Sequence, residues 1–216
     1  MGSAEEPVRP ITLDHLVYAT PDLAAGVDRI SAVLGVVAVP GGQHRGRGTR
    51  NALVGIGPRS YLEIIGPDQD QPPPDGPRWF GIDELREPRL VGWAAASTDI
   101  SGVTARARHE GLLLGAIGVG RRSRADGVEL EWRFTDPTVV VADGLVPFLI
   151  DWGSSPHPAL DAPRGAVILD LRAEHRDPLL VDRYLRIIGV DMPVSQAAAP
   201  ALVARFRTPS GEVVLR

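Results

Sequence analysis

The chain has 216 residues, of which 44% are hydrophobic and 23% charged, and this composition is typical of a globular protein rather than a disordered segment. Its 23 arginines and 27 acidic residues give a net charge of −4, so the basic face that a nucleic-acid partner requires is not expected. The sequence has no cysteine, no lysine, no apolar leader and no membrane-spanning run, which excludes thiolate and lysine Schiff-base chemistry and predicts a cytoplasmic protein without a membrane partner.

The first predicted elements lie between residues 11 and 65. Residues 13–19 alternate and are rich in β-forming side chains, which predicts a strand. Asp22 is the expected N-cap of a helix over residues 22–34, because its side-chain oxygen can accept hydrogen bonds from free N–H groups of the first turn. Gly35 is expected to end that helix in the left-handed conformation. Three further strands follow near 36–40, 48–56 and 60–65, so the predicted order is βαβββ.

The same order is predicted again, and a third time in shorter form. The second part has a strand at 90–97, a helix at 100–110 ended by Gly111, and strands near 114–119, 129–135 and 146–152. The third part has a strand at 166–172, a helix at 177–188 ended by Gly189, and strands at 201–207 and 212–215. Residues 120–127 are expected to be the solvated tip of a hairpin, with Asp126-Gly127 as its turn.

Two proline-rich stretches, 66–77 and 153–163, separate these parts, and short pieces of sequence recur between them. Residues 27–29 (VDR) reappear as residues 181–183 at an offset of 154, and a match between Asp22 and Asp99 has half that offset, 77. Equal spacing indicates internal duplication, although the repeated composition of helices would also produce matches this short.

The predicted fold class is α+β, with tandem βαβββ modules forming curved, partly barrel-like mixed sheets and helices on the outside. One module leaves a concave apolar sheet face, and pairing two modules closes the two faces over a shared cavity. The modules 11–65 and 90–152 are therefore expected to form one paired unit over residues 11–152. Residues 165–216 are expected to be a truncated third βαββ module packed on it.

Three stretches carry a resemblance to a known family. Residues 13–17 (LDHLV), followed by a helix that ends at Gly35, resemble the opening of vicinal oxygen chelate proteins. Residues 44–53 (HRGRGTRNAL), followed by residues 61–63 (YLE), are similar to the glyoxalase-like subfamily, as are residues 147–158. The resemblance covers about 190 residues, from Pro10 to the end of the chain.

This resemblance implies a divalent metal at the floor of the cavity, held by residues of the first and last strands. The matching positions of the first module are His15 and Glu63, a pair that suits Zn²⁺, Fe²⁺, Mn²⁺ or Ni²⁺. Gly92 and Ile150 stand at the matching positions of the second module and cannot bind a metal. Only half of a four-ligand set is therefore identified, unless a loop histidine, His44 or His157, contributes. A buried His15–Glu63 hydrogen-bonded pair without metal is the alternative.

Five further residues are candidates for binding the substrate. His44 lies in a loop rich in glycine and arginine, where arginines could grip a carboxylate or phosphate, and the alternative is a solvated turn. Thr49 and Asn51 share one face of their strand, and an asparagine in a cavity can orient a carbonyl or hydroxyl group. Trp93 is read as core or pocket wall. Arg133 is read either as an anion clamp or as part of an exposed charged face.

The leading functional hypothesis from the sequence is a metal-dependent lyase, isomerase or dioxygenase that acts on a small oxygenated substrate. Glu63 would carry the proton in that reaction. The other hypothesis is a metal-free protein that binds or sequesters a small molecule, and the missing ligands of the second module favour it. The sequence has no phosphate-binding loop or dinucleotide fingerprint, so no nucleotide cofactor is expected. A homodimer remains open.

Overall fold

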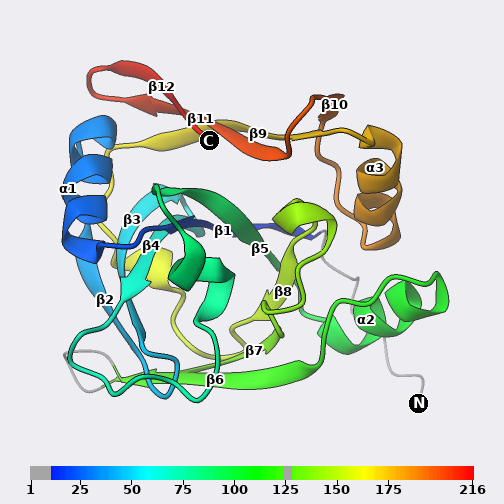
Figure 1. Ribbon diagram of the computed structural model, residues 1–216, viewed down its shortest axis with the longest axis horizontal. Coiled ribbons are helices and arrows are strands. Elements are labelled where there is room, and N and C mark those ends of the chain that lie inside the picture. Colours follow the sequence, from blue (N-terminus) through cyan, green and yellow to red (C-terminus); the bar gives the residue numbers. More distant parts are fainter. Residues whose placement is uncertain (1–10, 124–127) are drawn as a thin grey trace, which may run out of the picture.

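The computed structural model describes residues 11–123 and 128–216, and Figure 1 shows the arrangement of their helices and strands. The turn expected at Asp126-Gly127 lies outside the described residues. The protein has the expected α+β class, with strongly curved sheets and a few helices on the outside. No helix in the described part of the chain is both long and apolar enough to cross a membrane.

The first unit has the predicted βαβββ order. Its elements are β1 (Thr12–Ala19), α1 (Leu23–Leu34), β2 (Val39–His44), β3 (Thr49–Gly57) and β4 (Ser60–Pro67). The carboxylate of Asp22 accepts a hydrogen bond from the Ala25 amide at 3.1 Å, as expected of an N-cap. Gly35 ends the helix with a φ of 66°, a conformation that glycine adopts without steric cost.

The second unit has the same order of elements. They are β5 (Arg89–Ala96), α2 (Ile100–His109), β6 (Ile117–Ser123), β7 (Glu129–Thr135) and β8 (Phe148–Asp151). Asp99 caps α2 by accepting a hydrogen bond from the Gly102 amide at 2.8 Å. Strand β6 begins at Ile117 and continues to Ser123, so it extends beyond the segment 114–119 that the sequence predicts.

The strands of these two units form one eight-stranded sheet in the order β2-β3-β4-β1-β5-β8-β7-β6. In each unit the first strand pairs in parallel with the last, β1 with β4 and β5 with β8. The antiparallel pair β1–β5 joins the units at the centre. The sheet curves so far that its two edge strands, β2 and β6, contact each other, and its concave face surrounds a cavity.

Alternation along the strands separates two faces of this sheet. Leu16 and Tyr18 of β1 lie in the large core on the convex side, whereas Val17 packs with Ile65 in a smaller cluster on the concave side. His15 lies two residues before Val17 on the same strand, so it also faces the concave side. Glu63 lies two residues before Ile65 and also faces the cavity. The prediction that His15 and Glu63 share one sheet face is therefore confirmed.

The third unit forms a separate four-stranded sheet in the order β10-β9-β11-β12. Its elements are β9 (Val167–His175), α3 (Pro178–Ile187), β10 (Val194–Gln196), β11 (Ala201–Thr208) and β12 (Gly211–Leu215). The sequence analysis missed β10, which has only three residues. The pairing also differs from that of the other units, because β9 pairs in parallel with the strand that follows the helix rather than with the last strand.

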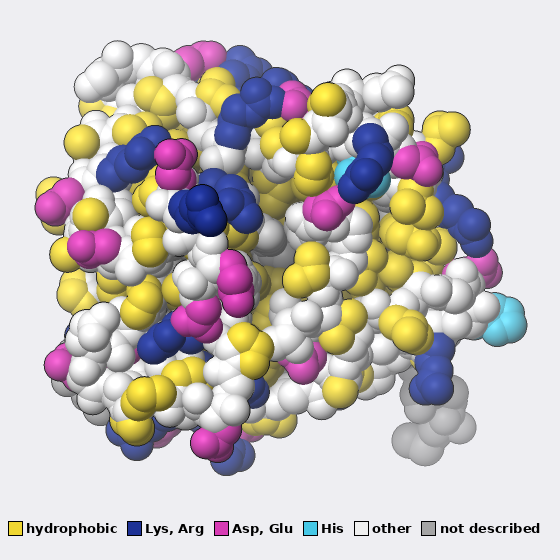
Figure 2. All heavy atoms as spheres, in the orientation of Figure 1, with side chains coloured by type: hydrophobic (Ala, Val, Ile, Leu, Met, Phe, Trp, Pro, Cys, Tyr) yellow, Lys and Arg dark blue, Asp and Glu magenta, His cyan; other side chains and the backbone are white. Residues whose placement is uncertain are grey.

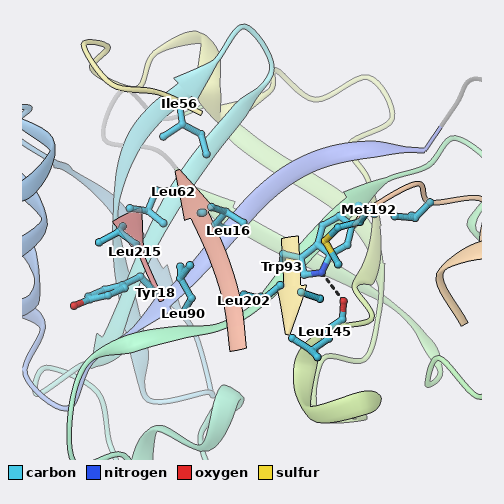
Figure 3. Packing of buried hydrophobic residues seen from close by; sticks show 14 of the residues in the cluster. Leu16, Tyr18, Ile56, Leu62, Leu90, Trp93, Leu145, Met192, Leu202 and Leu215 are labelled. Carbon is cyan, nitrogen blue, oxygen red and sulfur yellow. Dashed lines mark hydrogen bonds between the residues drawn. The ribbon is translucent and has the colours of Figure 1, made fainter. Parts of the chain in front are cut away.

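This second sheet packs on the convex face of the first (Figure 1). Figure 3 shows Leu202 of β11 and Leu215 of β12 among Tyr18 and Leu90 of the large sheet. Phe206 of β11 is fully buried in the same core. The third unit therefore covers apolar surface that the paired units would otherwise expose to water.

Phe206→Ala should lower the free energy of unfolding by about 3–5 kcal/mol, because it leaves a cavity between the two sheets. Val214→Ala on neighbouring β12 is the control, since Val214 is 54% exposed, and it should change the stability by less than about 0.5 kcal/mol. Urea unfolding followed by circular dichroism measures both. Equal effects of the two substitutions would contradict the shared core.

Candidate functional site

The concave face of the large sheet encloses a cavity with about 540 Å³ of empty space, counted out to its mouth. Both units contribute to the wall, and their contributions differ in chemistry. The residues that line the cavity include His15, His44, Asn51, Tyr61, Glu63, Trp79, Phe80, Arg122, Trp132, Phe134, Phe148, Ile150 and Trp152.

The second unit supplies a mostly apolar and aromatic wall. Trp132 of β7 and Trp152, which follows β8, lie with their ring centroids 5.1 Å apart. Gly120 of β6 leaves room for this wall, because a Cβ atom there would lie 2.3 Å from the ring of Trp132. Phe148 of β8 contacts the ring of His15 edge-on at 5.5 Å. This wall suits a planar or apolar part of a ligand.

The first unit supplies the polar side of the cavity. His15 Nε2 and Glu63 Oε2 lie 3.7 Å apart, and both side chains are less than one-tenth exposed. The amide nitrogen of Asn51 donates to Glu63 Oε1 at 2.5 Å. The ring of His15 stacks on Tyr61 with centroids 4.6 Å apart. Glu63 and His15 are thus held by their neighbours while their reactive atoms face each other.

Asp14 holds His15 from behind. The register between β1 and β5 shifts between Leu13 and His15, which leaves Asp14 as the extra residue, as in a β-bulge. Asp14 Oδ1 accepts a hydrogen bond from His15 Nδ1 at 2.7 Å, so Nδ1 carries a proton and Nε2 is left facing the cavity. Burial alone would raise the pKa of Asp14, but the hydrogen bonds from His15 and His157 outweigh it and lower the pKa.

His157 is a partner of Asp14 rather than part of the cavity wall. Its Nδ1 accepts a hydrogen bond from the Ala159 amide at 3.1 Å, so its Nε2 carries the proton and donates to Asp14 Oδ2 at 3.1 Å. Trp152 Nε1 also donates to Asp14 Oδ2, at 3.0 Å. Both nitrogens of His157 are therefore occupied, and the sequence-based suggestion that this loop histidine completes a metal site is not supported.

His44 stands on the other side of Glu63. Its Nδ1 lies 3.0 Å from Thr49 Oγ1, and its Nε2 is 3.3 Å from the amide nitrogen of Asn51. An amide nitrogen can only donate, so Nε2 is an acceptor and the imidazole is neutral. Burial lowers the pKa of His44 and outweighs the opposing influence of Glu63. Thr49 thus orients His44 from outside the cavity wall.

A segment that follows the first proline-rich stretch closes the cavity near His44. Trp79 and Phe80 line the cavity, and the ring of Trp79 lies 5.3 Å from that of His44. Two loop arginines that were expected to bind a ligand contact this segment or the proline-rich stretch before it instead. Arg47 lies over the ring of Trp79 at 5.0 Å, and Arg50 forms ion pairs with Asp68 and Asp70.

Four of the residues predicted from the sequence meet at the cavity: His15, His44, Asn51 and Glu63. Two others do not. Trp93 is 2% exposed in the convex core and donates a hydrogen bond to the Leu145 carbonyl (Figure 3). Arg133 is exposed and donates to Ser101, because alternation along β7 turns its neighbours Trp132 and Phe134 inward. Neither Trp93 nor Arg133 lines the cavity, so the expectation that they contact a ligand there is corrected.

Sequence reasoning missed three polar residues of the site. Asp14 was overlooked because a regular strand places it on the face opposite His15, and a bulge leaves no clear signal in one sequence. Tyr61 lies two residues before Glu63 on β4, so alternation could have predicted that it faces the cavity. Burial raises its pKa well above 10, so its phenol stays protonated. Arg122 was assigned to a solvated hairpin tip, although β6 continues through it.

The donors present do not complete a metal site. His15 and Glu63 offer two donor atoms, and the third candidate, His44 Nε2, lies 3.6 Å from Glu63 Oε1. Asn51 directs its N–H groups at both Glu63 Oε1 and His44 Nε2, so hydrogen atoms occupy the space that a cation would need. Within residues 11–123 and 128–216, no group of three His, Asp or Glu side chains has an arrangement suited to a metal ion.

Comparisons with known proteins concern the family and the fold of the chain. A family model described as a glyoxalase-like domain matches residues 13–186. A hypothetical protein from Staphylococcus aureus has a similar structure, with a TM-score of 0.62 and 15% identity over 94% of this chain and 84% of that one. Methylmalonyl-CoA epimerase from Mycobacterium tuberculosis aligns at a TM-score of 0.41 and 18% identity, over 74% and 97% of the chains. A search of curated proteins finds no significant sequence match.

The buried state of His44 predicts a pH dependence of stability. Because the pKa of His44 is lower in the folded protein than its ordinary 6.5, the unfolded chain binds a proton first as the pH falls. Stability should therefore be lost from about pH 6.5 downwards until the pH passes the folded-state pKa. In His44→Gln this loss should be smaller. Urea midpoints between about pH 7.5 and pH 5 test the prediction.

His109→Gln is the matched control, because His109 is exposed on α2 and contacts solvent. Its pH profile should follow that of the unsubstituted protein. A profile for His44→Gln with the same slope as both would show that burial of this imidazole does not contribute.

Proposed function

Because the chain belongs to the glyoxalase-like domain family of the vicinal oxygen chelate superfamily, we propose that its cavity binds a small oxygenated molecule and transfers a proton on it. The protein would be an isomerase or a lyase. Figure 2 shows arginine and acidic side chains interspersed over one face of the molecule, an arrangement that agrees with a small-molecule partner rather than a nucleic acid.

The observation that carries this proposal is the His15–Glu63 pair. An imidazole and a carboxylate, which can each accept and donate a proton, lie 3.7 Å apart in the cavity, and both side chains are buried. Each is fixed from behind by one further side chain, His15 by Asp14 and Glu63 by Asn51. Proton-transfer catalysts require this kind of preorganisation, since small displacements of the reacting groups cost large factors in rate.

Each residue has a distinct part in the proposed reaction. Glu63 removes a proton from a carbon atom next to a carbonyl group and returns it to the same or a neighbouring atom. His15 accepts a proton at Nε2 from a hydroxyl group of the ligand and returns it to a ligand oxygen, and Asp14 stabilises the imidazolium formed between these two transfers, because its carboxylate already binds Nδ1. The aromatic wall excludes water and so strengthens these interactions.

Binding of a divalent metal ion is a separate part of this proposal, and His15 and Glu63 supply only two donor atoms for it. If an ion binds, His15 and Glu63 would hold it, and the ion would polarise oxygen atoms of the substrate. Dioxygenase chemistry depends on such an ion, so this donor set favours isomerase or lyase activity. We expect weak binding of Ni²⁺ or Mn²⁺ in a calorimetric titration and none in His15→Ala. Tight stoichiometric binding would contradict the conclusion that the donors of this cavity do not complete a metal site.

One observation favours a metal-free binding protein as the second candidate. The amide nitrogen of Asn51 donates to both His44 Nε2 and Glu63 Oε1, and the aromatic wall alone can hold an apolar ligand. A protein that only sequesters a molecule needs no more than this. The two candidates differ in whether a bound molecule exchanges hydrogen with the solvent.

The decisive measurement is hydrogen–deuterium exchange of bound carbon acids in D₂O, followed by proton NMR over a panel of hydroxyketones, 2-oxo acids and 2-hydroxy acids. At least one compound should exchange faster with the protein than without it. Glu63→Gln should reduce that rate by about 10²-fold or more, because the amide cannot accept the proton. Glu131→Gln, on the exposed side of β7, should leave it unchanged. Binding without exchange across the panel would favour the sequestering protein.

A further inference from the structure

A groove lies next to the cavity, outside the site described above. It has about 1630 Å³ of empty space, counted out to its open mouth, against about 540 Å³ for the cavity counted in the same way. Its walls are formed by β5, by residues 136–147, which join β7 to β8, and by the first residues of β11. Figure 2 shows hydrophobic side chains in a hollow near the centre of this face, over β5 in the orientation of Figure 1.

The groove and the cavity share a boundary. Phe80, Pro137 and Phe148 line both spaces. On the cavity side, the ring of Phe148 contacts the ring of His15 edge-on at 5.5 Å. The ring of Phe80 lies 6.1 Å from that of Phe148. A ligand that binds at His15 is therefore separated from the groove only by these apolar side chains.

Phe80 is held at this boundary in an unusual backbone conformation. Its φ is 61° and its ψ is 22°, in the left-handed region that aromatic residues seldom adopt. Such a conformation persists where the surrounding structure fixes it, and ligand sites are a common location. Trp79 contacts the ring of Phe80 edge-on with centroids 6.4 Å apart. The half-buried ring of Phe80 thus has a defined place between the cavity and the groove.

Two glycines shape the groove from opposite walls. Gly144 has a φ of 85°, and a Cβ atom there would lie 2.3 Å from the Val91 carbonyl oxygen, so the wall formed by residues 136–147 lies directly against β5. At Gly92 of β5, a Cβ atom would lie 3.8 Å from the Gly144 carbonyl oxygen, which is an ordinary van der Waals distance. Gly92 therefore leaves space in the groove that a larger side chain would fill.

The floor and the rim of the groove are aliphatic. Leu90, Leu145 and Leu202, labelled in Figure 3, line it from three different segments of the chain, and all three are buried in the core. Val140 stands at the rim and is 63% exposed. This lining gains free energy when an apolar group displaces water from it.

Polar groups of the groove have partners within the protein. Asp143 Oδ2 accepts a hydrogen bond from His175 Nε2 at 3.1 Å, and Arg216 pairs with Glu174. In the floor, Trp93 Nε1 donates to the Leu145 carbonyl at 2.9 Å. These groups are already satisfied, so the contacts that the groove offers a ligand beside Phe80 and Phe148 are mainly apolar.

We infer that the ligand of this cavity carries an unbranched alkyl chain, which passes the ring of Phe80 and lies in the groove along β5. The inference rests on the proposed function and narrows its substrate class to hydroxyketones or hydroxy acids with a medium-length chain. The oxygenated end stays at the His15–Glu63 pair. An unbranched chain is the narrowest apolar group, and it needs no polar partner where it crosses the boundary.

Two homologous series test this inference in calorimetric titrations of the full chain. One series is 1-hydroxyhexan-2-one, 1-hydroxyoctan-2-one and 1-hydroxydecan-2-one, and the other is the 2-hydroxy acids of the same lengths. In at least one series, each added methylene group should raise the affinity about threefold, because burial of a methylene is worth about that factor. The longest compound should bind at least about tenfold more tightly than the shortest.

Gly92→Leu fills the groove and should remove this gain, so that the longest compound binds within about threefold of the shortest. The affinity for the shortest compound should stay within about threefold of that of the unsubstituted protein. Gly76→Leu is the matched control, since Gly76 is exposed and does not line the groove. Thermal unfolding of each variant establishes that it is folded.

Val140→Asp is a second variant, which changes only an exposed side chain. It places a charge beside the chain and should weaken binding of the longest compound at least about fivefold, while the shortest is unaffected. Val37→Asp is its control, because Val37 is 75% exposed and does not line the groove.

Three results would overturn the inference: affinity independent of chain length in both series, a gain with chain length that survives both Gly92→Leu and Val140→Asp, or no binding of any compound. Dimerisation that Val140→Asp abolishes, together with the first result, would assign the groove to a second copy of the chain. None of these results contradicts proton transfer, which the exchange measurement with Glu63→Gln tests separately. Absence of exchange together with a gain that Gly92→Leu removes would overturn the proposed reaction and leave the alkyl site in place.

Discussion

The buried carboxylate of Asp14 connects the two halves of the cavity. It accepts hydrogen bonds from His15 of its own strand and from Trp152 and His157, which follow the last strand of the second unit. A buried carboxylate without such partners would be strongly destabilising, so the three donors and Asp14 require one another. The position of the His15 ring, and with it the contact between His15 and Glu63, depends on this arrangement.

The sequence predicted most of the fold because the signals that specify it are local. N-caps at Asp22 and Asp99, glycine at the end of α1, and alternation along β1 and β4 each act within a few residues. The pairing of β9 with β10 could not be predicted in this way, since the first two units pair their first and last strands. Strand order in a sheet depends on contacts between distant segments.

The candidate site shows the same division. Alternation placed His15, Asn51 and Glu63 on one face correctly, because His15 follows the irregularity in β1 and the other two lie where β3 and β4 pair regularly. It failed for Asp14, where an irregular register changes the direction of one side chain. The sequence also did not predict that Arg122 lines the cavity, because this position depends on the contact between the edge strands β2 and β6. No pattern within one strand indicates a contact between two distant strands.

The reactive pair and the aromatic wall lie on different units of the chain. Substitutions at Trp132 or Phe134 can reshape the space for a ligand without touching Glu63 or its partner Asn51. Substitutions in the aromatic wall can therefore change which molecule the cavity accepts while the geometry of the His15–Glu63 pair is kept. Asp14 is the exception, because a change there alters both halves at once.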